Sequence, residues 1–292
     1  MKYIHSMWST PGKKDNFDNE FDKKYLIKNF YSYLFSALLV KKHGHTIELY
    51  CDENAYDLYS LIPYDNIHVI DLDNDGVDSK FWIYGKIKTH LLLNEPYIHI
   101  DGDVFLFNDV LKNFNDKYDL VVQSIENDKV LNKYFNVYYE SSTPFVNMKN
   151  LNIDWFKYDL TAFNCGVIGF NDIDFKNKYA KQTKDLLVKL SSGVDFVDNR
   201  NKYAGMFLLA EQSLLYYLTK EYNKKYLEVL PYDEMKKRNF VNWTNIADEI
   251  GYCHMLGYSK YKEKVINAII TNINRDFPEY SNTLKKFKKK YL

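Results

Sequence analysis

The chain has 292 residues, of which 46% are hydrophobic and 27% are charged, and its formal net charge at pH 7 is zero. This length suffices for one large α/β domain or two small ones. Because no net basic charge would attract nucleic acid, we expect no nucleic-acid partner. No run of about eighteen apolar residues occurs, so we expect no membrane-spanning helix.

Strand-like and helical segments alternate through the first third of the chain. Residues 21–43 favour a long helix, because Leu26, Phe30 and Leu34 recur on one face. The other segments of this part are strands at 2–8, 46–50, 67–72 and 97–100, and helices at 53–61 and 81–94. Such alternation predicts an α/β fold, with a mostly parallel central sheet flanked by helices.

The rest of the chain is less regular. Residues 124–160 show weak periodicity, and we expect an irregular excursion there. The regular segments that we expect are strands at 119–123, 161–170 and 227–230, and helices at 175–192, at 206–222 and from 261 onward. The chain therefore ends in a helical tail.

The three cysteines, Cys51, Cys165 and Cys253, are far apart in the sequence. This odd number and wide spacing match neither a disulfide framework nor a zinc-binding pattern. The first residues also lack the long apolar run of a signal peptide. We therefore expect a cytoplasmic protein, since thiols stay reduced there.

Two carboxylates, Asp101 and Asp103, follow the apolar strand at 97–100. They repel each other and are costly to desolvate, and a hard divalent cation would offset both effects because it prefers oxygen ligands. Gly102 between them lets the chain turn sharply. Ligands of α/β sheets bind outside the carboxyl ends of the strands, which favours a binding site here. The alternative is an ordinary surface turn.

Further along the chain, His254, Gly257 and Lys260 follow one another at intervals of three residues. An imidazole can bind a metal ion, a glycine permits close backbone approach, and an ammonium group balances phosphate charge. A lone histidine is more often structural than a metal ligand.

Other polar residues lie within apolar segments. Lys86 could balance phosphate charge or be an ordinary solvated lysine. The amide of Asn164 can donate to and accept from a hydroxyl group, although the segment around it could be only a bulge in a core strand. Glu211 and Gln212 fall within a predicted helix, where the alternative is an ordinary polar face.

These motifs, in this order, resemble those of GT-A glycosyltransferases. The pattern is closest to the retaining glycosyltransferase family 8, which includes glycogenin-like and bacterial lipopolysaccharide galactosyl- and glucosyltransferases. The resemblance spans roughly residues 80–260. Gly102 stands where the family usually has Ala or Ser, Glu211 stands for Asp, and no Pro-Trp follows Lys260. These departures indicate a divergent bacterial branch.

The resemblance implies a Rossmann-like GT-A fold over residues 1–260. It implies a metal-dependent enzyme that moves a hexose from UDP-glucose or UDP-galactose to a hydroxyl acceptor in surface glycan biosynthesis. Membership of this family would also imply retention of the linkage. The implied metal ligands are Asp101, Asp103 and His254. One imidazole among oxygen ligands favours Mn²⁺, with Mg²⁺ as the alternative.

The resemblance also implies the residues that meet the donor. Asn164, Glu211 and Gln212 would act at the reacting face of the sugar. The implied donor-binding residues are Ser6, Trp8, Lys86, Asp101, Gly102, Gly257 and Lys260. The Trp8 indole could stack on uracil or pack in the core. Residues 124–160 would form a wall of the site for a glycan or lipid-linked acceptor.

Two other function classes stay open. A catalytically weak nucleotide-sugar or carbohydrate-binding protein would have little reason to hold Asp101, Asp103 and His254 together. A nucleotidyltransferase should have a Gly-rich phosphate loop after the first strand, which residues 11–14 match poorly. The basic and aromatic residues of the tail at 285–292 could contact the inner face of an anionic membrane, or they could form a disordered charged segment.

Overall fold

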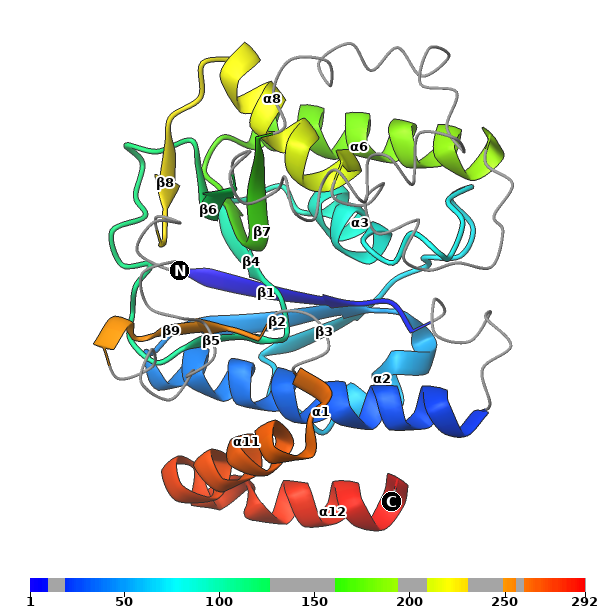
Figure 1. The fold of residues 1–292 in the computed structure, drawn as a ribbon, viewed down its shortest axis with the longest axis vertical. Coiled ribbons are helices and arrows are strands. Elements are labelled where there is room, and N and C mark those ends of the chain that lie inside the picture. Colours follow the sequence, from blue (N-terminus) through cyan, green and yellow to red (C-terminus); the bar gives the residue numbers. More distant parts are fainter. Residues whose placement is uncertain (10–18, 127–160, 194–208, 231–248, 256–259, 292) are drawn as a thin grey trace. The chain divides into compact units, whose positions relative to one another are not determined.

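The computed structural model describes residues 1–9, 19–126, 161–193, 209–230, 249–255 and 260–291 (Figure 1). The chain divides into two compact units. Unit 1 consists of Met1–Asp71, Tyr97–Asn113 and Asn239–Leu292. Unit 2 consists of Leu72–Pro96 and Phe114–Arg238.

Unit 1 contains four parallel strands in the order β3-β2-β1-β4. The central strand β1 pairs on both sides, with Ile4 opposite Glu48 on β2 and His99 on β4. All residues of β4 are buried, as is usual in a parallel sheet covered on its faces. The bounds of these strands are β1 Lys2–Met7, β2 Thr46–Cys51, β3 Asn66–Val69 and β4 Tyr97–Ile100.

Two helices follow β1 and β2. Helix α1 (Asn19–Lys42) runs along the sheet of unit 1 (Figure 1). It buries Phe30 and Leu34, which are on the apolar face predicted for it, together with Leu38. It ends before Gly44, whose φ of +76° suits glycine. Helix α2 (Glu53–Tyr59) begins where the Asp52 side chain accepts a hydrogen bond from the backbone N–H of Ala55.

The C-terminal part of unit 1 adds a second sheet and two helices. Strand β5 (Val104–Leu106) pairs antiparallel with β9 (Tyr252–His254). Helix α11 (Glu263–Asp276) is followed by the short 3₁₀ helix η5 (Pro278–Tyr280) and by α12 (Ser281–Tyr291). The helix predicted from about residue 261 begins at Glu263, and it is interrupted at Pro278 because proline lacks the N–H of a continuing helix.

The described residues of unit 2 form three strands and several helices. Strand β6 pairs antiparallel with β7 and parallel with β8, and its pairing with β7 shifts register between Val122 and Ser124. A π-helix, η3 (Leu209–Ser213), precedes α8 (Leu214–Glu221), where one uniform helix was expected. The remaining elements are α3 Tyr84–Leu92, β6 Leu120–Glu126, β7 Ala162–Phe170, α6 Ile173–Gly193 and β8 Tyr226–Glu228.

The predicted fold class is confirmed: helices and strands alternate, most strand pairs of the sheets are parallel, and the described chain ends in helices. The excursion expected at 124–160 lies outside the described residues beyond Glu126. Among the helices described, none combines the length and the apolar character that crossing a membrane requires.

Candidate functional site

The two aspartates lie in the turn between β4 and β5. The backbone N–H of Val104 donates to the carbonyl oxygen of Asp101 at 2.9 Å, which closes the turn. Asp103 is only 7% exposed, whereas Asp101 is half-buried. The turn therefore presents one carboxylate partly to solvent and holds the other inside the protein.

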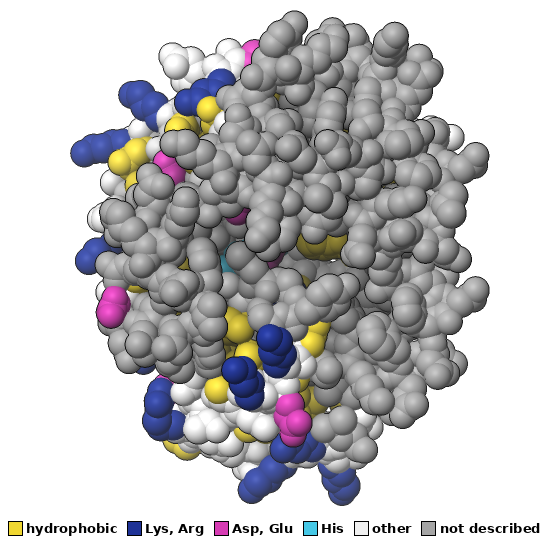
Figure 2. Space-filling model, in the orientation of Figure 1, with side chains coloured by type: hydrophobic (Ala, Val, Ile, Leu, Met, Phe, Trp, Pro, Cys, Tyr) yellow, Lys and Arg dark blue, Asp and Glu magenta, His cyan; other side chains and the backbone are white. Residues whose placement is uncertain are grey.

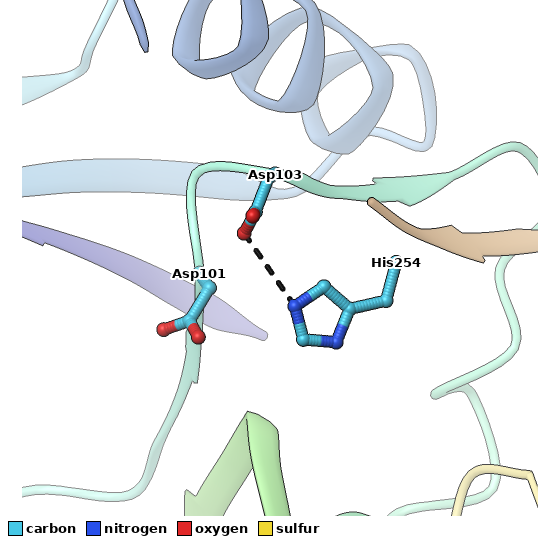
Figure 3. A group of neighbouring side chains, drawn as sticks. All are labelled: Asp101, Asp103 and His254. Atoms are coloured by element: carbon cyan, nitrogen blue, oxygen red, sulfur yellow. Dashed lines mark ion pairs between the residues drawn. The ribbon is translucent and has the colours of Figure 1, made fainter. Parts of the chain in front are cut away.

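Strand pairing brings His254 to the same turn. Val104 of β5 is the register partner of His254 on β9, and the N–H of Met255 donates to the carbonyl oxygen of Asp103 at 3.0 Å. His254 Nε2 lies 3.5 Å from Asp103 Oδ1 (Figure 3). One ligand atom each from Asp101, Asp103 and His254 lie within 4.8 Å of one another. The structure therefore brings together the three predicted metal ligands.

Lys260 forms an ion pair with Asp103. Its ammonium Nζ lies 2.7 Å from Asp103 Oδ2. Burial favours a higher pKa for the Asp103 carboxyl, but the charge of Lys260 and the contact with His254 together outweigh it and hold the pKa below its usual range. Asp103 is therefore an ionised, buried carboxylate. Gly257, which lies between His254 and Lys260 in the sequence and was predicted to bind the donor, is outside the described part of the chain.

The donor set fits a divalent cation. Two carboxylates supply hard oxygen ligands and negative charge, and the imidazole supplies one nitrogen. Mg²⁺ prefers oxygen and bound water, whereas Mn²⁺ accepts nitrogen as well. Asp101, Asp103 and His254 would hold such an ion.

Gly102 has a role that the sequence did not reveal. A Cβ at this position would lie 2.1 Å from Cε2 of Tyr33, a residue of α1. Tyr33 is itself held by a hydrogen bond from its hydroxyl to the carbonyl oxygen of Ser6 at 2.9 Å. Gly102 is not among the residues with positive φ. Glycine is therefore needed here for the space that the Tyr33 ring occupies, not for a left-handed backbone.

The residues predicted at the end of β1 lie in unit 1 as well. Ser6 is half-buried, and its Oγ lies 2.9 Å from Nε2 of the buried His99. The Nδ1 of His99 is 4.0 Å from Asp101 Oδ1. Trp8 is 7% exposed. His99 has no sequence signal of its own, because it is one histidine within an apolar strand.

A second polar cluster lies inside unit 2. The ammonium of Lys86 lies 2.8 Å from Glu211 Oε1 and donates to the carbonyl oxygen of Cys165 at 3.0 Å. Lys86 and Glu211 are 4% and 3% exposed, so Lys86 is not an ordinary solvated lysine. Glu211 belongs to the π-helix η3, an irregularity often found at functional sites. The structure therefore joins two of the predicted residues in one buried ion pair.

Asn164 and Gln212 complete the predicted residues of unit 2. Asn164 lies on β7, accepts a hydrogen bond from the N–H of Gly166 at 3.0 Å and donates to Glu126 Oε1 at 2.8 Å. Gln212 is half-buried and follows Glu211 on η3. The two side chains therefore differ. Both the nitrogen and the oxygen of the Asn164 amide form hydrogen bonds within the protein, whereas the Gln212 side chain is partly exposed.

Asp75 lies in an acidic stretch at 71–78, between β3 and α3, and its carboxylate has partners on two helices. Asp75 contacts Lys88 and Lys184, the latter at 2.9 Å, and accepts a hydrogen bond from the Tyr84 hydroxyl at 2.5 Å. Burial favours a higher pKa for Asp75, but these three partners lower it below the usual range. The side chain of Asp75 thus ties together α3 and α6 within unit 2.

Three comparisons with known proteins complete the description. A family model described as a family of unknown function (DUF6734) matches residues 1–287. No curated protein matches the sequence. A solved structure of the galactosyltransferase LgtC, in complex with donor and acceptor sugar analogs, is 12% identical with a TM-score of 0.38, over 72% of each chain. An active-site mutant of LgtC is 10% identical with a TM-score of 0.39, over 71% of this chain and 70% of that one.

Proposed function

The chain belongs to the family described as a family of unknown function (DUF6734), and we propose that it is a metal-dependent glycosyltransferase of the GT-A type. The proposed reaction moves a hexose from UDP-glucose or UDP-galactose to a hydroxyl group of a glycan or lipid-linked acceptor, with retention at the anomeric carbon. The motif order described above supports the donor class and the stereochemistry.

One observation carries the proposal: the Asp101, Asp103 and His254 ligand atoms lie within 4.8 Å of one another, beside the ammonium of Lys260. Residues distant in the sequence supply this set, through the pairing of β5 with β9. Two carboxylates, an imidazole and an ammonium group are the groups that a divalent cation and a diphosphate require together. An ordinary surface turn would not require the imidazole or the ammonium group.

Both the metal-ligand cluster of unit 1 and the polar cluster of unit 2 have a proposed role in the reaction. When bound, Mn²⁺ supplies Lewis-acid stabilisation of the diphosphate leaving group. Lys260 adds positive charge where negative charge develops. On unit 2, we propose that Asn164 and Gln212 bind sugar hydroxyls, and that Glu211, oriented by Lys86, stabilises the positive charge that develops on the sugar ring. Ser6 and Trp8 are proposed to contact the nucleotide.

The test is Mn²⁺-dependent hydrolysis of a panel of UDP-, GDP- and ADP-sugars, with metal and donor binding measured in parallel by calorimetry. Asp103→Asn and His254→Ala should lose both Mn²⁺ binding and turnover. The matched control is Asp116→Asn, which removes the same charge from an exposed residue of unit 2 and should behave as the wild type. Absence of both turnover and Mn²⁺ binding in the wild-type protein would overturn the proposal.

The buried Lys86–Glu211 pair favours one alternative, a nucleotide-sugar-binding protein with weak or no catalysis. In this pair the Glu211 carboxylate already has a cationic partner at 2.8 Å. This alternative predicts that calorimetry detects Mn²⁺-dependent donor binding while neither hydrolysis nor transfer occurs. Turnover that is lost in Glu211→Gln, with donor binding retained, would reject it.

We also propose that α12 contacts an anionic membrane surface, which would bring the enzyme to a lipid-linked acceptor. The basic residues of α12 are exposed, and Figure 2 shows lysine and arginine side chains on the face that carries this helix. Leu284 and Phe287 are buried, so the contact would be electrostatic rather than insertional. The exposed residues are Lys285, Lys286, Lys288, Lys289 and Lys290.

Replacing Lys285, Lys286 and Lys289 with Gln should lower sedimentation with phosphatidylserine vesicles. Binding of the wild type should also fall as salt is raised, because salt screens exposed charges. Deleting the helix would be a poorer test, since it would also remove the buried Phe287, whose ring stacks on Phe30 with centroids 3.9 Å apart. Equal vesicle binding by wild type and variant would contradict the contact.

A further inference from the structure

Both oxygens of the Asp103 carboxylate have partners within unit 1. Oδ2 contacts the Lys260 ammonium at 2.7 Å, and Oδ1 lies 3.5 Å from His254 Nε2. Because Asp103 is only 7% exposed, water cannot freely replace either partner. A divalent cation that uses Asp103 must therefore share this carboxylate with Lys260 or displace it.

Sharing is unfavourable on electrostatic grounds. A dication bound to Asp103 would lie within a few ångströms of the Lys260 ammonium, where two positive charges repel strongly in a partly desolvated site. Displacement is feasible, because the lysine side chain is flexible and that of Lys260 is 22% exposed. His254 differs from Lys260 in this respect, because a neutral imidazole can join the coordination sphere of the ion.

We infer that Lys260 competes with the divalent cation for Asp103 and moves to the diphosphate when both ligands bind, so that metal and nucleotide binding are coupled through one side chain. The inference rests on the proposed function and adds a regulation of the same site. It assigns Lys260 opposite effects: it weakens metal binding in the absence of nucleotide and strengthens binding of the nucleotide once the metal is present.

If Lys260 competes with the ion for Asp103, removing the charge of Lys260 should increase the affinity of the site for Mn²⁺. Lys260→Met, which keeps the length of the side chain but removes its charge, should bind Mn²⁺ at least about fivefold more tightly than the wild type without nucleotide. Fivefold is the lower end of common coupling factors between two sites. A lysine that only supports the structure of the site would give weaker binding or no change.

The coupling predicts a second effect with the opposite sign. UDP should raise the Mn²⁺ affinity of the wild type by a larger factor than that of Lys260→Met, since the variant has no ammonium group to transfer from Asp103 to the diphosphate. By reciprocity, Mn²⁺ should raise UDP affinity by the same factor in each protein. UDP, rather than a UDP-sugar, is the probe, so that donor hydrolysis does not interfere.

The experiment measures free Mn²⁺ by electron paramagnetic resonance in titrations of the full chain, with and without UDP. Lys260→Arg keeps the cation and should remain close to the wild type. Lys264→Met removes the same charge from an exposed position of α11 and corrects for the change in net charge. Thermal unfolding of each variant confirms that the proteins compared are folded.

The outcomes distinguish a failure of the competition from a failure of the proposed function. Tighter Mn²⁺ binding in Lys260→Met alone, with reduced coupling to UDP, supports the inference. If the wild type binds Mn²⁺ and Lys260→Met binds it equally or less tightly, the competition is rejected while the metal site stands. If no protein binds Mn²⁺ with or without UDP, the proposed function itself fails.

Discussion

Gly102 and Tyr33 show how one residue can depend on another that is distant in the chain. The Tyr33 ring occupies the place where a side chain at position 102 would begin, with its Cε2 at 2.1 Å from an added Cβ. The ring of Tyr33 is in edge contact with those of His5 and Tyr59, with centroids 5.0 Å away in each case. These neighbours leave the ring little freedom to move aside, so the turn that holds Asp101 and Asp103 requires glycine.

Gly102→Ala should therefore lower the free energy of unfolding by about 1–3 kcal/mol, the usual cost of overpacking. It should also weaken Mn²⁺ binding, because the turn must shift. In a Tyr33→Ala background, which opens the space, the same change should cost less. Urea unfolding and Mn²⁺ titration of the four proteins would measure this coupling, and an equal cost of Gly102→Ala in both backgrounds would contradict the steric explanation.

The Lys86–Glu211 pair is a second feature that depends on single residues. The two charged groups are 2.8 Å apart and almost completely buried. Burying two charges is costly, and the cost is offset only while both partners are present.

Lys86→Met should lower the free energy of unfolding by about 3–5 kcal/mol, because it leaves the Glu211 carboxylate buried without this cation. The double variant Lys86→Met/Glu211→Leu should be more stable than Lys86→Met, since it removes both charges. Chemical denaturation of the two variants tests the order. A double variant less stable than Lys86→Met would show that the pair contributes through something other than mutual charge compensation.

At the scale of the element, helix α3 ends against a buried lysine of α6. Lys176 is 0% exposed, and its ammonium donates to the carbonyl oxygens of His90, at 2.7 Å, and of Leu93. Burial lowers the pKa of Lys176 to about 8. A cation at the C-terminus of a helix also interacts favourably with the helix dipole. Lys176 therefore caps α3 from a neighbouring helix.

Lys176→Met should leave these carbonyl groups buried without their donor. Because a hydrogen bond from a charged group contributes about 1.5–3 kcal/mol, we expect a loss of at least that size. The last turn of α3 should lose the most protection in hydrogen exchange. Lys181→Met, on the exposed side of α6, is the matched control and should change little. Unaltered protection at residues 90–93 would contradict the capping role.

At the scale of the whole molecule, each unit contains a buried histidine. Burial lowers the pKa of His5 in unit 1 to about 3, although the nearby charge of Asp103 opposes this effect. Burial, with the charges of Lys86 and Lys176, also lowers the pKa of His90 in unit 2. Both histidines are neutral in the folded protein and bind protons near pH 6.5 when it unfolds.

Both units should therefore lose stability as the pH falls. The stability from the neutral histidines is fully present above about pH 6.5 and decreases toward pH 3 for His5, by at most about 1.4 kcal/mol per pH unit for each histidine. His5→Gln, which keeps groups that can bond to Tyr64 and Ser36, should show a shallower decrease between pH 6.5 and 5, above the range of most carboxylates. Equal slopes in urea unfolding would contradict this prediction.

The limits of sequence-based prediction follow from the same residues. Helix α1 and strand β4 were predicted because their apolar residues recur with the periods of a helix and a strand, which neighbouring residues determine. Asp101 and Asp103 were predicted as site residues from chemical type and from their position after a buried strand, and His254 and Lys260 from the resemblance of their motif to that of a known family. Tyr33 and His99 were missed, because their roles arise from contacts with Gly102 and Ser6 that leave no local pattern.

The sequence by itself determined the alternation of helices and strands and the kinds of ligand atoms available, because both depend on residue type and on neighbours along the chain. Only the tertiary structure decided that Lys260 contacts Asp103, that Lys86 is buried against Glu211 and that Lys176 caps α3. These contacts join residues from different elements. Their charges are stabilised by partners that packing brings together, and packing depends on the whole fold rather than on any one segment.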